Sequence, residues 1–177
     1  DYAWAREQLQ AHRLAALCPV LFSPVHGQLE PRRLAEWILR DRLPVRFQLL
    51  IYPATDQRRG WPSHTSNGQG YLLTADTMDY FHDHYIPDKA MDLEWRASPL
   101  LHPDLSKLPP ALVLTAGYDP LRDEALQYSH KLTLAGNRVT HINFERQIHG
   151  FITMGRVIDE ANAAVQICAA ELRRALA

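Results

Sequence analysis

The feature that most constrains the fold is a short apolar run at residues 111–116, which follows two prolines and precedes a glycine. An uninterrupted apolar run between chain-breaking residues is typical of a strand buried on both faces of a parallel sheet. Residues 47–52 and 139–144 are also strand-like, and a stretch with helical character, residues 124–134, lies between the last two strands. The sequence therefore predicts an α/β protein built on a mainly parallel sheet that is flanked by helices.

Two side chains with complementary chemistry follow two of these strands. Asp119 comes soon after the strand at 111–116, and His149 comes after the strand-like stretch at 139–144, directly before Gly150. Open α/β sheets place their reactive groups at the carboxyl ends of the strands. An imidazole that takes a proton from a hydroxyl nucleophile needs a carboxylate to fix its tautomer and stabilise its charge. We therefore predict that Asp119 and His149 are the acid and the base of a hydrolytic triad.

The nucleophile of such a triad is not evident, because no Gly-x-Ser-x-Gly motif occurs in the 177 residues. Ser23 is the candidate, since it follows a short apolar strand predicted at 19–22 and precedes a predicted helix. The next residue is Pro24, which has no N–H to offer an oxyanion. The alternative is that Ser23 only caps a turn before proline, and we favour that interpretation.

Four motifs resemble a known family. They are Leu-Leu-Ile-Tyr-Pro at 49–53, Ala-Ser-Pro-Leu at 97–100, Asp-Pro-Leu-Arg-Asp-Glu at 119–124 and His-Gly-Phe at 149–151. Residues 47–177 resemble the C-terminal half of the hormone-sensitive-lipase family of α/β-hydrolases, the bacterial carboxylesterases, in which the acid also precedes the histidine.

This resemblance implies a truncated α/β-hydrolase fold with a mainly parallel sheet of about four strands. It also implies that the chain hydrolyses short-chain acyl esters, with Asp119 as acid and His149 as base. The nucleophile motif Gly-Asp-Ser-Ala-Gly and the oxyanion motif His-Gly-Gly-Gly of that family are absent from the sequence. Two alternatives therefore stay open: a catalytically inactive hydrolase fragment, and a module that binds small molecules without turnover.

The first part of the chain resembles a different protein. It contains Cys-Pro-Val-Leu-Phe-Ser-Pro-Val-His-Gly-Gln-Leu at 18–29, Leu-Ala-Glu-Trp-Ile-Leu at 34–39 and Pro-Val-Arg-Phe-Gln-Leu at 44–49. By these stretches, residues 1–49 are similar to the C-terminal tail of 7-carboxy-7-deazaguanine synthase. That protein is a radical enzyme whose iron–sulfur cluster needs three cysteines in a Cys-x-x-x-Cys-x-x-Cys run. The chain has only Cys18 and Cys168, so that activity is not expected here. We interpret the chain as a fusion near Phe47: residues 1–46 are a fused helix-strand-helix segment, and 47–177 are the C-terminal half of a hydrolase. Together, residues 1–177 would form one partial domain.

Other polar residues have simpler explanations. His82 and His84 are two residues apart on a predicted helix and point to different sides, so no metal site is expected. Asp123 and Glu124 are expected to favour the positive end of a helix dipole. Three hydroxyl residues in a loop rich in glycine and proline are expected to serve only that loop: Ser63, Thr65 and Ser66.

The composition and motifs of the chain indicate which kinds of partner are not expected. The formal net charge of −1 and the lack of a basic stripe argue against nucleic acid. No signal peptide, no membrane-spanning run and no cofactor motif are evident, so a cytoplasmic protein without cofactor or metal is expected. A sheet of about four strands leaves an edge that is interior in the family fold. We therefore expect a homo-oligomer that covers this edge, with the strand at 139–144 as a second candidate interface.

Overall fold

A parallel sheet with a helix on each face forms the centre of the molecule. The computed structural model describes residues 45–86 and 88–177. Its strands are β1 (Gln48–Ile51), β2 (Ala111–Tyr118) and β3 (Val139–Ile148), which pair in parallel in the order β1-β2-β3. The predicted fold class is confirmed. The fourth predicted strand, at 19–22, and the candidate Ser23 lie outside the described residues.

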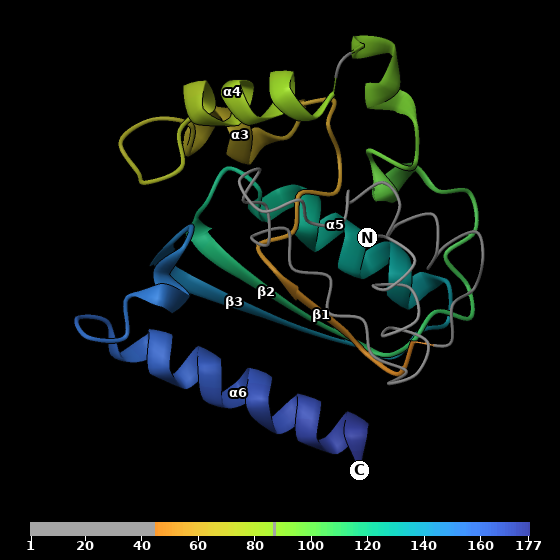
Figure 1. Cartoon of the computed structure of the whole chain (residues 1–177), viewed down its shortest axis with the longest axis vertical. Helices are drawn as coiled ribbons and strands as arrows, with labels where there is room; N and C mark the ends of the chain where they lie inside the picture. The colour runs from red at the N-terminus through yellow and green to blue at the C-terminus, as the bar shows by residue number, and fades with distance from the viewer. Residues whose placement is uncertain (1–44, 87) are drawn as a thin grey trace, which may run out of the picture.

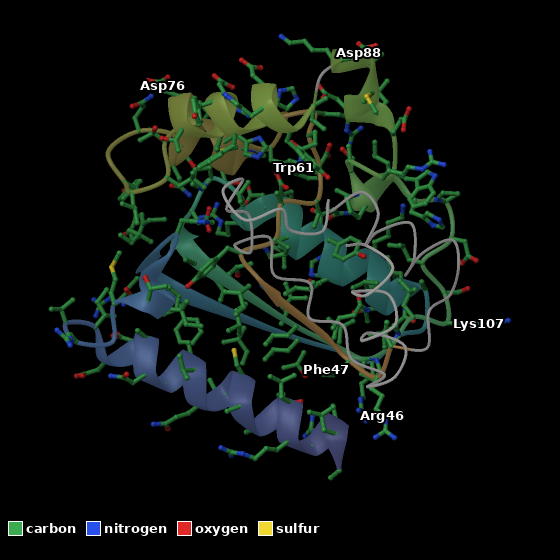
Figure 2. All side chains as sticks on the ribbon, in the orientation of Figure 1. Arg46, Phe47, Trp61, Asp76, Asp88 and Lys107 are labelled. Carbon is green, nitrogen blue, oxygen red and sulfur yellow. The ribbon has the colours of Figure 1, made fainter. Side chains whose placement is uncertain are left out.

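Side chains of β2 alternate between two apolar layers. Val113 faces α5 (Arg122–Leu134), whereas Leu112 and Leu114 face α6 (Asp159–Leu176), and the two helices lie on opposite sides of the sheet (Figure 1). The α5 layer contains Ala125, Tyr128 and Leu132, and the α6 layer contains Ala161, Ala164 and Cys168. Phe47, just before β1, points into the α6 layer (Figure 2). Burial on both faces explains why β2 is a continuous apolar run.

Strand β3 is longer than the sequence predicted. Its pairing with β2 passes from Ala116 opposite Phe144 to Tyr118 opposite Ile148, so residues 145–147 lie opposite the single residue Gly117. The prediction ended at Phe144 because the polar residues that follow interrupt the apolar pattern. The structure accommodates them in an irregularity of the β-bulge type, and the strand resumes directly before His149.

The long connection between β1 and β2 begins beyond the carboxyl ends of the strands and returns along α5 to the amino end of β2 (Figure 1). It contains α3 (Pro62–Ser66), α4 (Ala75–Tyr85) and two short 3-10 helices, η4 (Lys89–Leu93) and η5 (Pro99–Leu101). Helix α4 begins at the N-cap Thr74, whose side chain accepts a hydrogen bond from the amide of Thr77 at 3.2 Å. The connection therefore covers the rim on which the candidate site was predicted.

The buried face of α6 is narrower than the apolar residues in and just before the helix would suggest. Val157 precedes the helix and is 81% exposed, and Val165 is 50% exposed. The buried positions are Ala161, Ala164 and Cys168, which share one helical face at spacings of three and four residues. Small side chains there let α6 pack closely on the sheet. No helix in the described part of the chain is long and apolar enough to cross a membrane.

Candidate active site

The carboxyl ends of β2 and β3 bring the predicted acid and base together. Asp119 directly follows β2, and His149 directly follows β3. The Oδ2 atom of Asp119 lies 2.8 Å from Nδ1 of His149. Adjacent parallel strands end at the same rim, so residues 30 positions apart in the chain become neighbours.

Asp119 is held so that only one carboxylate oxygen is left for the histidine. Its side chain is 1% exposed, and Oδ1 accepts a hydrogen bond from the amide of Leu121 at 2.9 Å. An ionised carboxylate can only accept hydrogen bonds, so beside it Nδ1 of His149 is the donor, and in the neutral imidazole Nε2 then carries the lone pair. The His149 side chain is 20% exposed. This arrangement fits the predicted role of His149 as a general base that is open to a reactant.

Tyr52, at the end of β1, supports the loop that carries His149. The ring centroids of Tyr52 and His149 are 4.9 Å apart, and the Tyr52 hydroxyl accepts a hydrogen bond from the amide of Ile152 at 3.0 Å. Tyr52 is buried and has a φ of 48°, a left-handed conformation that is uncommon for residues with a side chain. Gly150 also has a positive φ, of 81°, and begins the short helix η6 (Phe151–Thr153).

Sequence reasoning missed the role of Tyr52. A signal was present, because Tyr52 is the last residue of the predicted strand at 47–52 and so falls on the same rim as Asp119 and His149. All three described strands therefore contribute a residue to this site.

The buried serines of the described residues donate their hydroxyl groups to backbone carbonyls. The Ser63 hydroxyl donates to the carbonyl of Pro120, and the Ser98 hydroxyl donates to the carbonyl of Asp92 at 2.7 Å. Both are fully buried, and the third buried serine, Ser129, donates its hydroxyl to the carbonyl of Leu126 at 2.7 Å. The described part of the chain thus holds the predicted acid and base, while the candidate nucleophile Ser23 falls outside it.

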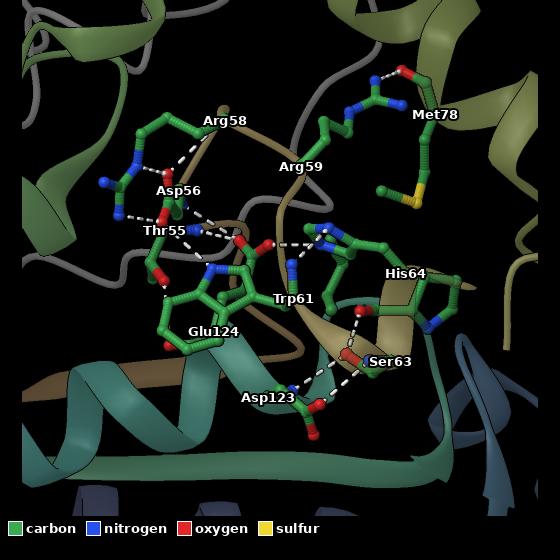
Figure 3. A network of polar contacts seen from close by, with 12 residues as sticks. Thr55, Asp56, Arg58, Arg59, Trp61, Ser63, His64, Met78, Asp123 and Glu124 are labelled. Carbon is green, nitrogen blue, oxygen red and sulfur yellow. Dashed lines mark hydrogen bonds and ion pairs between the residues drawn. The ribbon is translucent and has the colours of Figure 1, made fainter. Parts of the chain in front are cut away.

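A second polar network lies beside this rim and centres on Glu124 in the first turn of α5 (Figure 3). Its side chain is 1% exposed. One carboxylate oxygen accepts the backbone amides of Thr55 and Asp56, and the other lies 2.8 Å from Nε2 of His64. The sequence had suggested only an interaction of Glu124 with the helix dipole. The structure shows instead a buried carboxylate that binds residues 60 or more positions away.

Burial and charge act on both partners of this pair. Burial raises the pKa of Glu124 above its ordinary value, against the opposing hydrogen bonds from His64 and the two amides. Burial by itself lowers the pKa of His64, but the hydrogen bond and charge of Glu124 outweigh it and raise that pKa. The pair therefore holds a proton more readily than the same groups do in water.

The two histidines of α4 each contact a different group. Nε2 of His82 lies 2.7 Å from Oδ1 of Asp92, and Nδ1 of His84 lies 2.7 Å from the carbonyl of Tyr80. No group of three metal-ligating side chains occurs within residues 45–86 and 88–177. The two rings turn to different partners, as their spacing on a helix predicts.

The fold and the rim with its carboxylate and imidazole define a class of protein. Residues 32–153 match the family described as alpha/beta hydrolase fold, and the chain belongs to this family. The match begins before Phe47, inside the segment that the sequence suggested to be fused.

Several individual proteins to which the chain is similar are esterases. The chain is 36% identical over 137 residues to an ethyl acetate hydrolase of Pseudomonas putida, which covers 77% of this chain and 43% of the relative. A hyperthermophilic esterase from the archaeon Pyrobaculum calidifontis superposes with a TM-score of 0.73 at 39% identity, covering 82% of this chain and 49% of that one. The chain thus spans less than half the length of the esterases it matches.

A short segment matches an unrelated enzyme. Over 52 residues, the chain is 56% identical to 7-carboxy-7-deazaguanine synthase of Chlorobaculum tepidum, which covers 29% of this chain and 24% of that protein. Both resemblances that the motifs suggested are therefore confirmed.

Proposed function

We propose that this chain carries the acid and base of a carboxylic ester hydrolase that acts on short-chain acyl esters. His149 is the general base, Asp119 orients it, and Ser23 is the candidate nucleophile. The observation that supports this proposal best is the 2.8 Å contact between Nδ1 of His149 and the buried carboxylate of Asp119. The ethyl acetate hydrolase of Pseudomonas putida makes short esters the first substrates to test.

The reaction follows from the tautomer of His149. Nε2 takes the proton of the serine hydroxyl while the serine oxygen bonds to the ester carbonyl carbon, and the carbonyl oxygen becomes an oxyanion. When the carbonyl re-forms, the bond to the alcohol breaks, and the proton on Nε2 passes to the departing oxygen. Water then repeats both steps on the acyl-enzyme and releases the carboxylic acid. Asp119 stays ionised and stabilises the imidazolium in each step.

The test is hydrolysis of p-nitrophenyl acetate and p-nitrophenyl butyrate by the whole chain and by three variants. We expect His149→Ala to abolish enzymatic turnover, and Asp119→Asn to reduce kcat by about 10³-fold or more, because the imidazole then loses its tautomer and charge partner. Ser23→Ala should abolish turnover if Ser23 is the nucleophile.

An exposed histidine provides the control, because free imidazoles also cleave activated esters. His130 lies on the exposed side of α5, so His130→Gln should retain the parent rate. Unchanged turnover in Ser23→Ala removes Ser23 from the mechanism, and a covalent phosphonate probe followed by mass spectrometry then identifies the residue that attacks. A parent chain with no more turnover than His149→Ala contradicts the esterase proposal.

One observation favours a second function. The 177 residues contain no Gly-x-Ser-x-Gly motif, although the proposed acid and base are in place. A chain of this kind would bind small acyl compounds without hydrolysing them. Saturable binding of butyrate or a short ester by calorimetry, without product formation, would support this alternative.

A further inference from the structure

The turn that carries Asp119 contains carbonyl groups that the sheet does not satisfy. Residues 117–121 leave the carboxyl end of β2 and enter α5 within a few positions. Buried carbonyl groups need donors, and a turn whose carbonyls are each bonded has little freedom to rotate. The donors that reach this turn therefore decide where the Asp119 carboxylate points.

Asn67 supplies two of these donors from the end of α3. Its side chain is buried, and Nδ2 lies 3.2 Å from the carbonyl oxygen of Gly117 and 3.2 Å from that of Asp119. A primary amide carries two N–H groups and can bridge two carbonyls in this way. The same carbonyls also accept hydrogen bonds from Arg122, through its side chain and its backbone amide. The turn can therefore stay folded without Asn67 while losing one of its constraints.

Ser63 holds the next carbonyl of the same turn. Its hydroxyl donates to the carbonyl of Pro120 and lies 3.2 Å from the amide nitrogen of Asp123, which donates to it. In return, the carboxylate of Asp123 accepts the amide of Ser63 at 2.9 Å, and these bonds join α3 to the start of α5 (Figure 3).

Helix α3 is too short to keep this position by itself, since it spans only Pro62–Ser66. Glu124 anchors it, because its carboxylate binds His64 within α3 and the amides of the segment that precedes α3. Two consecutive carboxylates on α5 thus bind α3, and α3 in turn binds the turn that carries Asp119.

We propose that Asn67 and Ser63 are positioning residues, which hold this turn so that the carboxylate of Asp119 meets its histidine. The inference rests on the proposed function for its catalytic consequence. Its structural consequence, the formation of the Asp119–His149 hydrogen bond, can be measured whether or not the chain turns over an ester.

The test compares the parent chain with Asn67→Ala by proton NMR of protein labelled with ¹⁵N-histidine. A proton on Nδ1 that is bonded to a buried carboxylate resonates far downfield, and His149→Gln assigns the signal. We expect Asn67→Ala to lose or broaden this resonance. If the chain is active, kcat should fall by about tenfold to a hundredfold with little change in KM, because a small misplacement of a catalytic group is costly.

Asn137 is the matched control. Its side-chain amide also bridges two backbone carbonyls, those of Leu105 and Leu132 at 2.7 and 2.8 Å, but it lies before β3, at the opposite end of the sheet. Asn137→Ala should lower thermal stability to an extent similar to Asn67→Ala and leave the His149 resonance and kcat unchanged. Ser63→Ala is the second test variant, in case Asn67→Ala does not fold.

Each outcome has one interpretation. Loss of the resonance in Asn67→Ala or Ser63→Ala, with retention in Asn137→Ala, supports the proposal. An unchanged resonance in the two α3-side variants overturns it, and so does its absence from the folded parent chain. A parent that shows the resonance but no ester hydrolysis contradicts the proposed function alone.

Discussion

At the scale of single residues, Gly117 decides how closely β2 and β3 approach beside the acid. A Cβ atom at this position would lie 1.9 Å from the carbonyl oxygen of Glu145, and this oxygen belongs to the backbone of the paired strand. Because neither strand can yield without breaking the pairing, Gly117→Ala should lower the free energy of unfolding by about 1–3 kcal/mol. Urea unfolding measures the change, and the His149 resonance should weaken in parallel.

Gly60 offers a matched control for this substitution. Nothing lies within 4 Å of a Cβ atom built there, and the residue is exposed. Gly60→Ala should therefore change the free energy of unfolding by no more than about 0.5 kcal/mol. Equal effects of the two substitutions would contradict the close approach at Gly117.

At the scale of elements, the contact of α3 with α5 should make stability depend on pH. The pKa of His64 is raised in the folded chain, so its contribution to stability is full below the ordinary histidine pKa of about 6.5 and is lost as pH rises through the folded-state value. The pKa of Glu124 is also raised in the folded chain, so its contribution to stability is likewise lost as the pH rises. The difference in free energy of unfolding between the parent and His64→Gln should be larger at pH 5 than at pH 8, by about 1 kcal/mol. Urea unfolding of both proteins at the two pH values measures this difference.

His141 should show the opposite dependence. Burial, with a smaller effect from the charge of His130, lowers its pKa in the folded chain. The unfolded chain therefore binds a proton at His141 before the folded chain does, and stability falls as the pH drops below about 6.5. His141→Gln should remove this loss at acid pH. If the stabilities of His64→Gln and His141→Gln changed with pH in the same way, the pH dependence would not arise at these histidines.

At the scale of the whole molecule, the sheet formed by the described residues has two outer strands, β1 and β3. Within the described residues, β3 pairs only with β2, and β1 occupies the other side. Unpaired strand edges favour association with another chain. We propose that copies of this chain associate, through the β1 side or through β3. Sedimentation velocity over about a hundredfold range of concentration should show a rising mean mass, and a constant monomer mass would contradict this proposal.

Local patterns explain how much of this architecture was predictable. An apolar run as in β2 is defined by residues close in sequence, so the parallel strands, α4, α5 and the rim that carries Asp119 were all expected. The end of β3 was missed because a bulge is set by the partner strand rather than by the residues that form it.

The contacts around the site join residues that are far apart in the sequence, so no local pattern predicts them. His64 and Glu124 are 60 positions apart, and Tyr52 and Ile152 are 100 positions apart. Their residue types fit loops and helix ends equally well, so only the folded chain shows that they anchor α3 and the histidine loop. The sequence by itself determined which strands form, and with them the rim where an acid and a base would stand. Only the tertiary structure decided that their side chains touch and what holds them, because hydrogen bonds of buried groups depend on which distant donors the packing brings within reach.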